Sequence, residues 1–142
     1  METTFLRRQG QPGLAYNRLP AADPALPGLM FLGGFRSDRG GTKAGFLEES
    51  CRRRGQAYVR FDYSGHGGSE GRFEDGTIES WRDDALAVFD ALTEGPVVLA
   101  GSSMGGWIGL LLALQRPERV RGFVGIAAAP DFTREMVERR FD

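Results

Sequence analysis

A five-residue segment, Gly101-Ser102-Ser103-Met104-Gly105, constrains the fold of this chain more than any other part of its sequence. An all-apolar run at 97–100 precedes it and predicts a buried strand, and the apolar residues after it predict a helix at about 104–115. A serine on a tight turn between strand and helix has strained backbone angles, and the two elements pass very close together there. Glycine is therefore required two residues before and two after it, and only the frame centred on Ser103 meets this requirement.

The remaining chain alternates short apolar runs with longer amphipathic stretches. Two N-terminal strands are expected at 3–8 and 14–19, joined by a turn at 10–13. Four buried strands follow in the prediction, at 29–32, 58–61, 97–100 and 122–127. The predicted helices lie at about 42–54, with Thr42 as the expected cap, from Thr77 to about 94, at 104–115, and from about 132 onward. This order predicts an α/β fold with three layers, a mostly parallel sheet and helices on both of its faces.

A second glycine-rich segment, Leu32-Gly33-Gly34-Phe35, follows the predicted strand at 29–32. An acyl-transfer site needs two N–H donors aimed at the oxyanion that forms on the attacked carbonyl. The Met104 N–H, directly after Ser103, is one candidate donor, and the Phe35 N–H is the other. A plain glycine turn is the alternative interpretation of this segment.

His66 is the only histidine of the chain and would be the obvious general base for Ser103. It lies between two glycines in the turn after the strand at 58–61, four residues beyond Asp62, and nothing in the sequence places its ring near Ser103. We therefore favour a structural role for His66, and we expect Asp62 to brace the same turn. Asp131 follows the last predicted strand and could supply an acid, although capping a following helix is the preferred interpretation.

The composition excludes several other classes of protein. A net charge of −1 gives no indication of nucleic-acid binding, and no apolar run approaches the roughly 18 residues of a membrane span. The single cysteine excludes an internal disulfide, and the N-terminal residues lack a secretory signal, so a cytoplasmic, bacterial-type protein is expected. The glycines at 65–67 are followed by Glu70, which breaks the dinucleotide-binding fingerprint.

Several segments together resemble the N-terminal portion of an α/β-hydrolase, namely 60–69, 81–84, 101–107 and 116–118. The branch they resemble contains palmitoyl-protein thioesterases, acyl-glucuronide esterases and their bacterial relatives. The resemblance covers nearly the whole chain and implies a serine esterase or thioesterase without metal or organic cofactor. It matches Ser103 to the nucleophile of the elbow and Met104 and Phe35 to the oxyanion positions, whereas Gly33 stands where many hydrolases have histidine.

The same resemblance implies that the triad acid and histidine follow later strands, beyond Asp142. We therefore expect residues 1–142 to form a partial domain, truncated after about the sixth strand, that is inactive alone. The implied substrates are small-molecule or acylated-protein esters and thioesters. Two alternatives remain: a non-catalytic interaction protein of the same fold, and a nucleotide-binding α/β protein. The apolar strand at 122–127 would form an unpaired sheet edge, which predicts self-association.

Overall fold

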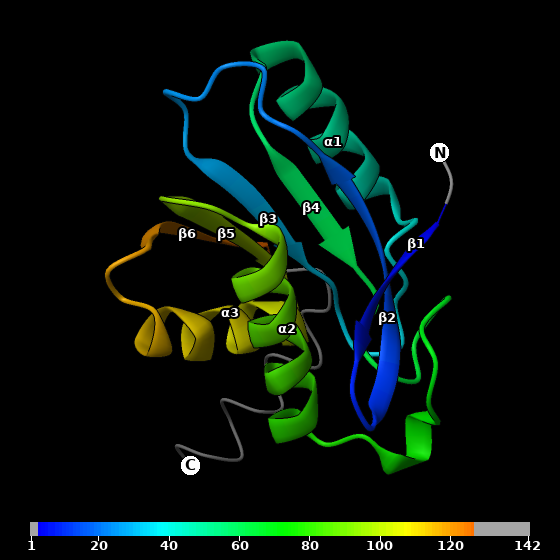
Figure 1. Ribbon diagram of the computed structural model, residues 1–142. Helices are drawn as coiled ribbons and strands as arrows, with labels where there is room; N and C mark the ends of the chain where they lie inside the picture. Colours follow the sequence, from blue (N-terminus) through cyan, green and yellow to red (C-terminus); the bar gives the residue numbers. More distant parts are fainter. Residues whose placement is uncertain (1–2, 127–142) are drawn as a thin grey trace.

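Six strands form one sheet in the computed structural model of the chain, which describes residues 3–126 (Figure 1). Their order across the sheet is β1-β2-β4-β3-β5-β6. The β1 and β2 strands are antiparallel, and β4, β3, β5 and β6 run parallel to one another. This arrangement confirms the predicted mostly parallel α/β sheet. The strands are β1 (Thr4–Arg8), β2 (Gln11–Leu19), β3 (Gly28–Leu32), β4 (Tyr58–Phe61), β5 (Val97–Ser102) and β6 (Val120–Ile126).

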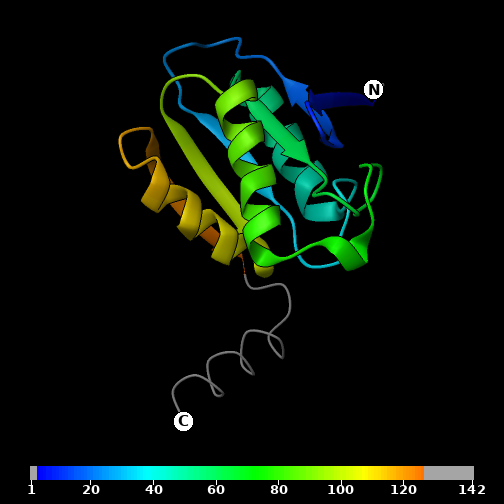
Figure 2. The same ribbon diagram turned by 60° about the horizontal axis from the view of Figure 1, so that its bottom comes forward.

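Helices cover both faces of this sheet (Figures 1 and 2). One face carries α1 (Thr42–Arg54), and the other carries α2 (Ile78–Leu92) and α3 (Met104–Gln115). Because successive side chains of a strand point to opposite faces, the central β3 strand contributes to two cores. Leu29 and Phe31 pack in the core under α1, and Met30 and Leu32 pack in the core under α2 and α3. Burial on both faces accounts for the unbroken apolar run of this strand.

The second predicted helix begins where expected, at Thr77, whereas the expected cap of the first helix differs. Thr77 caps α2, because its hydroxyl accepts from the Ser80 N–H in a reciprocal capping box. The predicted cap at Thr42 is wrong, since Gly41 is the N-cap of α1 and Thr42 is its first helical residue. Gly41 has the extended backbone, φ −66° and ψ 164°, that an N-cap position requires.

Two strand boundaries also differ from the prediction. The turn predicted at 10–13 is tighter, because β2 already begins at Gln11. Its left-handed residue is Gly10, with φ 73°. The β6 strand begins at Val120 and is not a buried strand, since Val124 is 52% exposed and β5 is its only partner within 3–126. Ala127, Asp131 and the helix predicted near 132 lie outside the described residues.

Candidate functional site

Ser103 lies on the turn between β5 and α3, where it is the N-cap residue of the helix. Its φ of 58° and ψ of −118° lie in a region that residues with a Cβ rarely occupy. The turn is closed by a hydrogen bond of 2.9 Å from the Gly106 N–H to the Ser103 carbonyl oxygen. Backbone strain of this kind persists only where the surrounding structure determines it, and here it falls on the predicted nucleophile.

The two glycines around Ser103 are required by the close contact of strand and helix. A Cβ added to Gly101 would collide with the backbone carbonyl of Gly105. A Cβ added to Gly105 would overlap the Leu32 carbonyl and lie 2.6 Å from the Gly33 carbonyl oxygen. The next residue, Gly106, has no such restriction, because its nearest neighbour would be 3.8 Å away.

The loop at 33–41 meets Ser103 at the carboxyl ends of β3 and β5. A Cβ on Gly34 would lie 3.4 Å from the Ser103 Cβ, so the two segments lie side by side there. Phe35 follows with its side chain 45% exposed, whereas the Met104 side chain is 2% exposed. Within residues 3–126 neither the Phe35 N–H nor the Met104 N–H has a hydrogen-bond acceptor. The N–H groups of Phe35 and Met104, which have no acceptor among the described residues, therefore lie on the two segments that adjoin Ser103.

Asp62 fastens the 33–41 loop to the turn after β4. Its carboxylate is 1% exposed and accepts hydrogen bonds from the Arg39 N–H at 2.6 Å and the Gly68 N–H at 2.9 Å. The Arg39 guanidinium forms an ion pair with the same carboxylate, and Arg60 donates to the Arg39 carbonyl at 2.8 Å. The expected bracing of the turn by Asp62 is present, but the sequence contains no signal for its pairing with Arg39.

Tyr63 holds the beginning of the same loop. Its hydroxyl donates a hydrogen bond of 3.0 Å to the Gly33 carbonyl oxygen. Burial raises the pKa of the Tyr63 phenol well above its usual value, and the nearby Asp84 carboxylate raises this pKa further. The phenol therefore remains a protonated donor to the loop at any physiological pH.

His66 is buried among aromatic rings and does not reach Ser103. It is 3% exposed, and its ring centroid lies 5.1 Å from that of Trp81 and 5.3 Å from that of Phe73. The His66 Nδ1 lies 3.1 Å from the Ser64 carbonyl oxygen, which can only accept, so Nδ1 carries the proton. The buried Nε2 has no hydrogen-bond partner among residues 3–126. The structure thus does not bring the two residues together.

A buried carboxylate that sequence analysis missed supports the turn around His66. Asp84, on α2, is 2% exposed and accepts hydrogen bonds from the Ser64 N–H at 2.8 Å and the Ser64 hydroxyl at 2.7 Å. Arg8, from β1, forms an ion pair with the same carboxylate. Nothing in the spacing of these residues predicts their contact. Asp131, the other acid considered for the site, lies outside the described residues.

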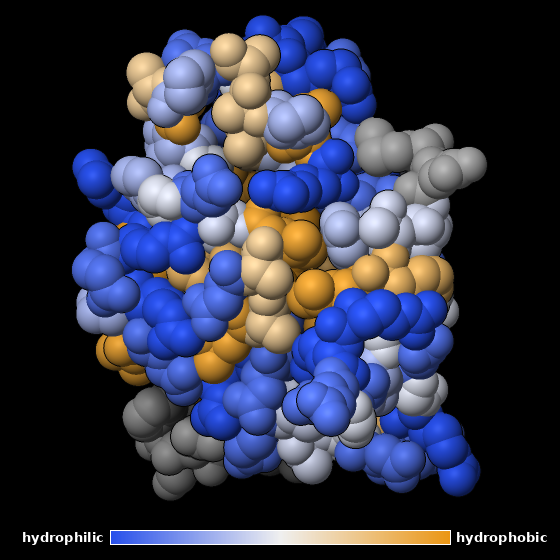
Figure 3. Space-filling model, viewed as in Figure 1, coloured by the Kyte–Doolittle hydropathy of each residue, from blue (hydrophilic) through white to orange (hydrophobic). Residues whose placement is uncertain are grey.

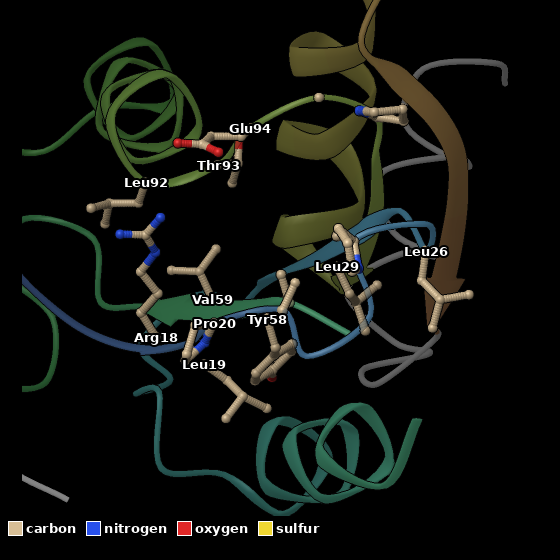
Figure 4. A pocket seen from close by; sticks show the side chains of 16 residues that line it. Arg18, Leu19, Pro20, Leu26, Leu29, Tyr58, Val59, Leu92, Thr93 and Glu94 are labelled. Atoms are coloured by element: carbon tan, nitrogen blue, oxygen red, sulfur yellow. The ribbon is translucent and has the colours of Figure 1, made fainter. Parts of the chain in front are cut away.

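A pocket of about 540 Å³ lies at the opposite edge of the sheet, where β3, β4 and β5 begin (Figure 4). Its lining is mostly apolar and includes Leu29, Tyr58 and Leu92, with Arg18 and Glu94 as charged members. Figure 3 shows the molecule in the view of Figure 1, where apolar side chains gather in the middle of the visible face and hydrophilic ones border them. Because Ser103 lies at the carboxyl ends of the strands, we do not assign this pocket to its chemistry.

The sequence of the chain is similar to a known family and to several named proteins. A family model described as the alpha/beta hydrolase fold matches residues 31–142. A bovine protein named palmitoyl-protein thioesterase ABHD10, mitochondrial, is 47% identical over 128 residues, which are 90% of this chain and 41% of the relative. The human protein of the same name is 45% identical over the same shares of both chains. The chain thus spans less than half the length of these relatives.

Solved structures show the same similarity. Mouse alpha/beta hydrolase domain-containing protein 10 superposes with a TM-score of 0.84 at 40% identity, over 99% of this chain and 59% of that one. A putative hydrolase from Agrobacterium vitis S4 gives a TM-score of 0.84 at 38% identity, over 99% of this chain and 57% of that one.

None of the helices in the described part of the chain has the length and apolar character needed to cross a membrane.

Proposed function

Because the chain belongs to the α/β-hydrolase family, we propose that it is a serine hydrolase that cleaves carboxylic ester or thioester bonds through Ser103. The observation that carries the proposal is the strained backbone of Ser103, with φ 58°, on a strand-to-helix turn that only glycine can flank. Relatives named as palmitoyl-protein thioesterases support the substrate class, which covers acylated proteins and small-molecule esters or thioesters.

The proposed reaction proceeds through an acyl-enzyme. The Ser103 hydroxyl attacks the carbonyl carbon, its proton passes to a general base, and negative charge develops on the carbonyl oxygen. The free N–H groups of Phe35 and Met104 are the proposed donors to this oxygen, and the N-terminus of α3 adds a favourable dipole. Collapse of the intermediate breaks the bond to the alcohol or thiol, which leaves with the proton, and water then hydrolyses the acyl-enzyme.

We further propose that no histidine within these 142 residues serves Ser103 as its general base. The only histidine of the sequence is His66, whose ring is buried and whose Nδ1 is engaged by Ser64. A serine hydroxyl is a weak nucleophile at its free pKa, so the 142-residue chain alone is expected to hydrolyse esters slowly. The oxyanion donors would leave only residual catalysis.

A fluorophosphonate probe tests the nucleophile directly, because it forms a covalent bond with an activated serine. The probe is applied to the longest natural polypeptide that contains these residues. We expect labelling that Ser103→Ala abolishes and that the matched control Ser102→Ala, at the adjacent position, preserves. Labelling that survives in Ser103→Ala would contradict the proposal. An absence of labelling in all three proteins would favour a non-catalytic interaction protein.

A further inference from the structure

Arg36 shares its backbone strain with only one other non-glycine residue in the described part of the chain. Its φ is 61°, and the other residue is Ser103, with φ 58°. Arg36 lies in the 33–41 loop, two residues after Gly34, which lies beside Ser103. An L-residue rarely adopts a positive φ, so the surrounding structure holds the Arg36 backbone in a conformation that an unconstrained loop would avoid.

Two aromatic rings support the Arg36 side chain. The guanidinium carbon lies 4.7 Å from the centroid of the Phe73 ring and 5.6 Å from that of the Phe35 ring. These distances are within the range of cation–π attraction. Phe35 and Phe73 are themselves in edge contact, at 5.1 Å between centroids. The charge of Arg36 is therefore held over the rings beside the loop that contacts Ser103.

The Arg36 side chain is open to solvent. Within 3–126 its guanidinium has no ion pair and no hydrogen bond, and the residue is exposed. Of the acids on the adjoining segments, Asp38 accepts from the Gly40 N–H at 2.8 Å and Glu74 lies 3.5 Å from Arg72. The N–H groups of the guanidinium are therefore open to a ligand.

We propose that Arg36 binds an anionic group of the substrate, a carboxylate or a phosphate, close to the carbonyl that Ser103 attacks. A planar guanidinium recognises both groups through paired N–H donors, and stacking on rings leaves those donors free. The inference rests on the proposed function only in taking Ser103 as the reacting residue. The competing interpretation is that Arg36 merely covers the Phe73 ring, in which case the charge of a ligand would not matter.

Two matched ligands separate these interpretations, namely 2-(hexylthio)acetate and 2-(hexylthio)acetamide. They have nearly the same shape and differ in charge, and neither contains an ester, so their binding does not require Ser103 to react. Binding to the 142-residue chain is followed by ¹⁵N–¹H NMR titration. We expect the anion to bind roughly three- to tenfold more tightly than the amide, with shifts centred on residues 34–36, and to lose this preference at high salt.

Substitutions test whether Arg36 causes the preference for the anionic ligand. Arg36→Met keeps the apolar stem and is expected to bring the affinity ratio to about one, whereas Arg36→Lys should retain part of it. The control Arg18→Met removes another exposed arginine, at the opposite edge of the sheet, and should leave the ratio unchanged. Equal affinities in the wild type, failure of both ligands to bind, or an unchanged ratio in Arg36→Met would overturn the proposal.

Ser103→Ala separates this proposal from the proposed function. It should abolish fluorophosphonate labelling and preserve the affinity ratio, because Arg36 and the rings beneath it are untouched. In the wild-type sequence, equal affinities for the two ligands together with Ser103-dependent labelling would refute only the role of Arg36. A charge preference without such labelling would refute only the reaction at Ser103.

Discussion

The Nη2 of Arg8 lies 3.0 Å from the Oδ1 of Asp84, and the two side chains are only 13% and 3% exposed. Asp84 also accepts both hydrogen bonds from Ser64. The N-terminal hairpin, α2 and the turn that contains His66 therefore meet at one carboxylate. Burying the two charges costs desolvation energy, which their mutual attraction offsets. If one partner is removed, the other charge stays buried without a counterion.

Removal of one partner should therefore be strongly destabilising. We expect Asp84→Asn to lower the free energy of unfolding by about 3–5 kcal/mol, because it leaves the Arg8 charge without its counterion. The control Asp83→Asn, next to it on α2 with a side chain 59% exposed, should cost less than about 1 kcal/mol. Urea denaturation of both variants measures the difference. Similar losses in the two would contradict a special role for the buried pair.

The two adjacent glycines at the start of α3 should respond oppositely to the same substitution. Gly105→Ala forces a Cβ into the carbonyls of Leu32 and Gly33 and should cost about 1–3 kcal/mol or more. Gly106→Ala has room for the methyl group and should gain up to about 1 kcal/mol from the better helix propensity of alanine. Thermal unfolding of the two variants tests this, and a destabilised Gly106→Ala would show that our account of the contact is wrong.

The strained backbone at Ser103 predicts that glycine is a more stable replacement there than alanine. Glycine accepts the positive φ and removes a cost of about 1–2 kcal/mol, which exceeds its own entropic cost of about 0.5–1 kcal/mol. Ser103→Gly should therefore be more stable than Ser103→Ala, which keeps a Cβ, by up to about 1 kcal/mol. Both variants lose the hydroxyl and should not be labelled. Denaturant unfolding would refute this explanation if it found the alanine variant to be the more stable.

Tyr63 should make the fold sensitive to alkaline pH. Burial, and then the Asp84 carboxylate, raise the pKa of its phenol in the native state, whereas in the unfolded chain a tyrosine ionises at about 10. Stability from this group is complete below that pH and falls as the pH rises above it, because only the unfolded chain then releases the proton.

The matching variant is Tyr63→Phe, which should cost about 1 kcal/mol at pH 8 through loss of the hydrogen bond to Gly33. Between pH 8 and about 10.5 it should lose less stability than the wild type. Tyr58 is present in both proteins, and burial raises the pKa of its phenol too, so the comparison isolates Tyr63. Equal losses over this interval would contradict the assignment.

The edge formed by β6 should promote self-association. Within the described part of the chain β6 pairs with β5 alone, and Val124 is 52% exposed on it. We expect sedimentation velocity to show concentration-dependent association that Val124→Lys reduces. The control Phe46→Lys changes another exposed apolar residue, 65% exposed on α1, and should leave association unaltered. A monomer at all concentrations would exclude the edge as a contact.

Local patterns predicted most of the elements, because the physics that forms them is local. The capping box at Thr77 and the need for glycine at 101, whose added Cβ would meet the Gly105 carbonyl, follow from contacts between residues close in sequence. The ion pairs of Asp84 and Asp62 join distant segments and leave no periodic signal. An apolar run likewise predicts a strand without indicating how far its side chains are exposed, as in β6.

Chemical reasoning has a similar limit at the site. The uniqueness of His66 in the sequence does not place its ring near Ser103, since proximity is set by how the chain folds. The roles of Ser103, Phe35 and Met104 stay predictions, as does the cytoplasmic location. Relatives that share nearly half of the residues are named as mitochondrial proteins, so compartment does not follow from this part of the sequence.

The attachment of the 33–41 loop to Asp62 has a consequence for protein engineering. The conformation of this loop is encoded partly outside it, since Asp62 holds Arg39 by backbone and side chain and Arg60 binds the Arg39 carbonyl. A chimera that received only residues 33–41 would inherit the glycines and Phe35 without their anchor. A transplantable unit must therefore include the end of β4, and libraries that vary the loop should leave Arg39, Arg60 and Asp62 unchanged.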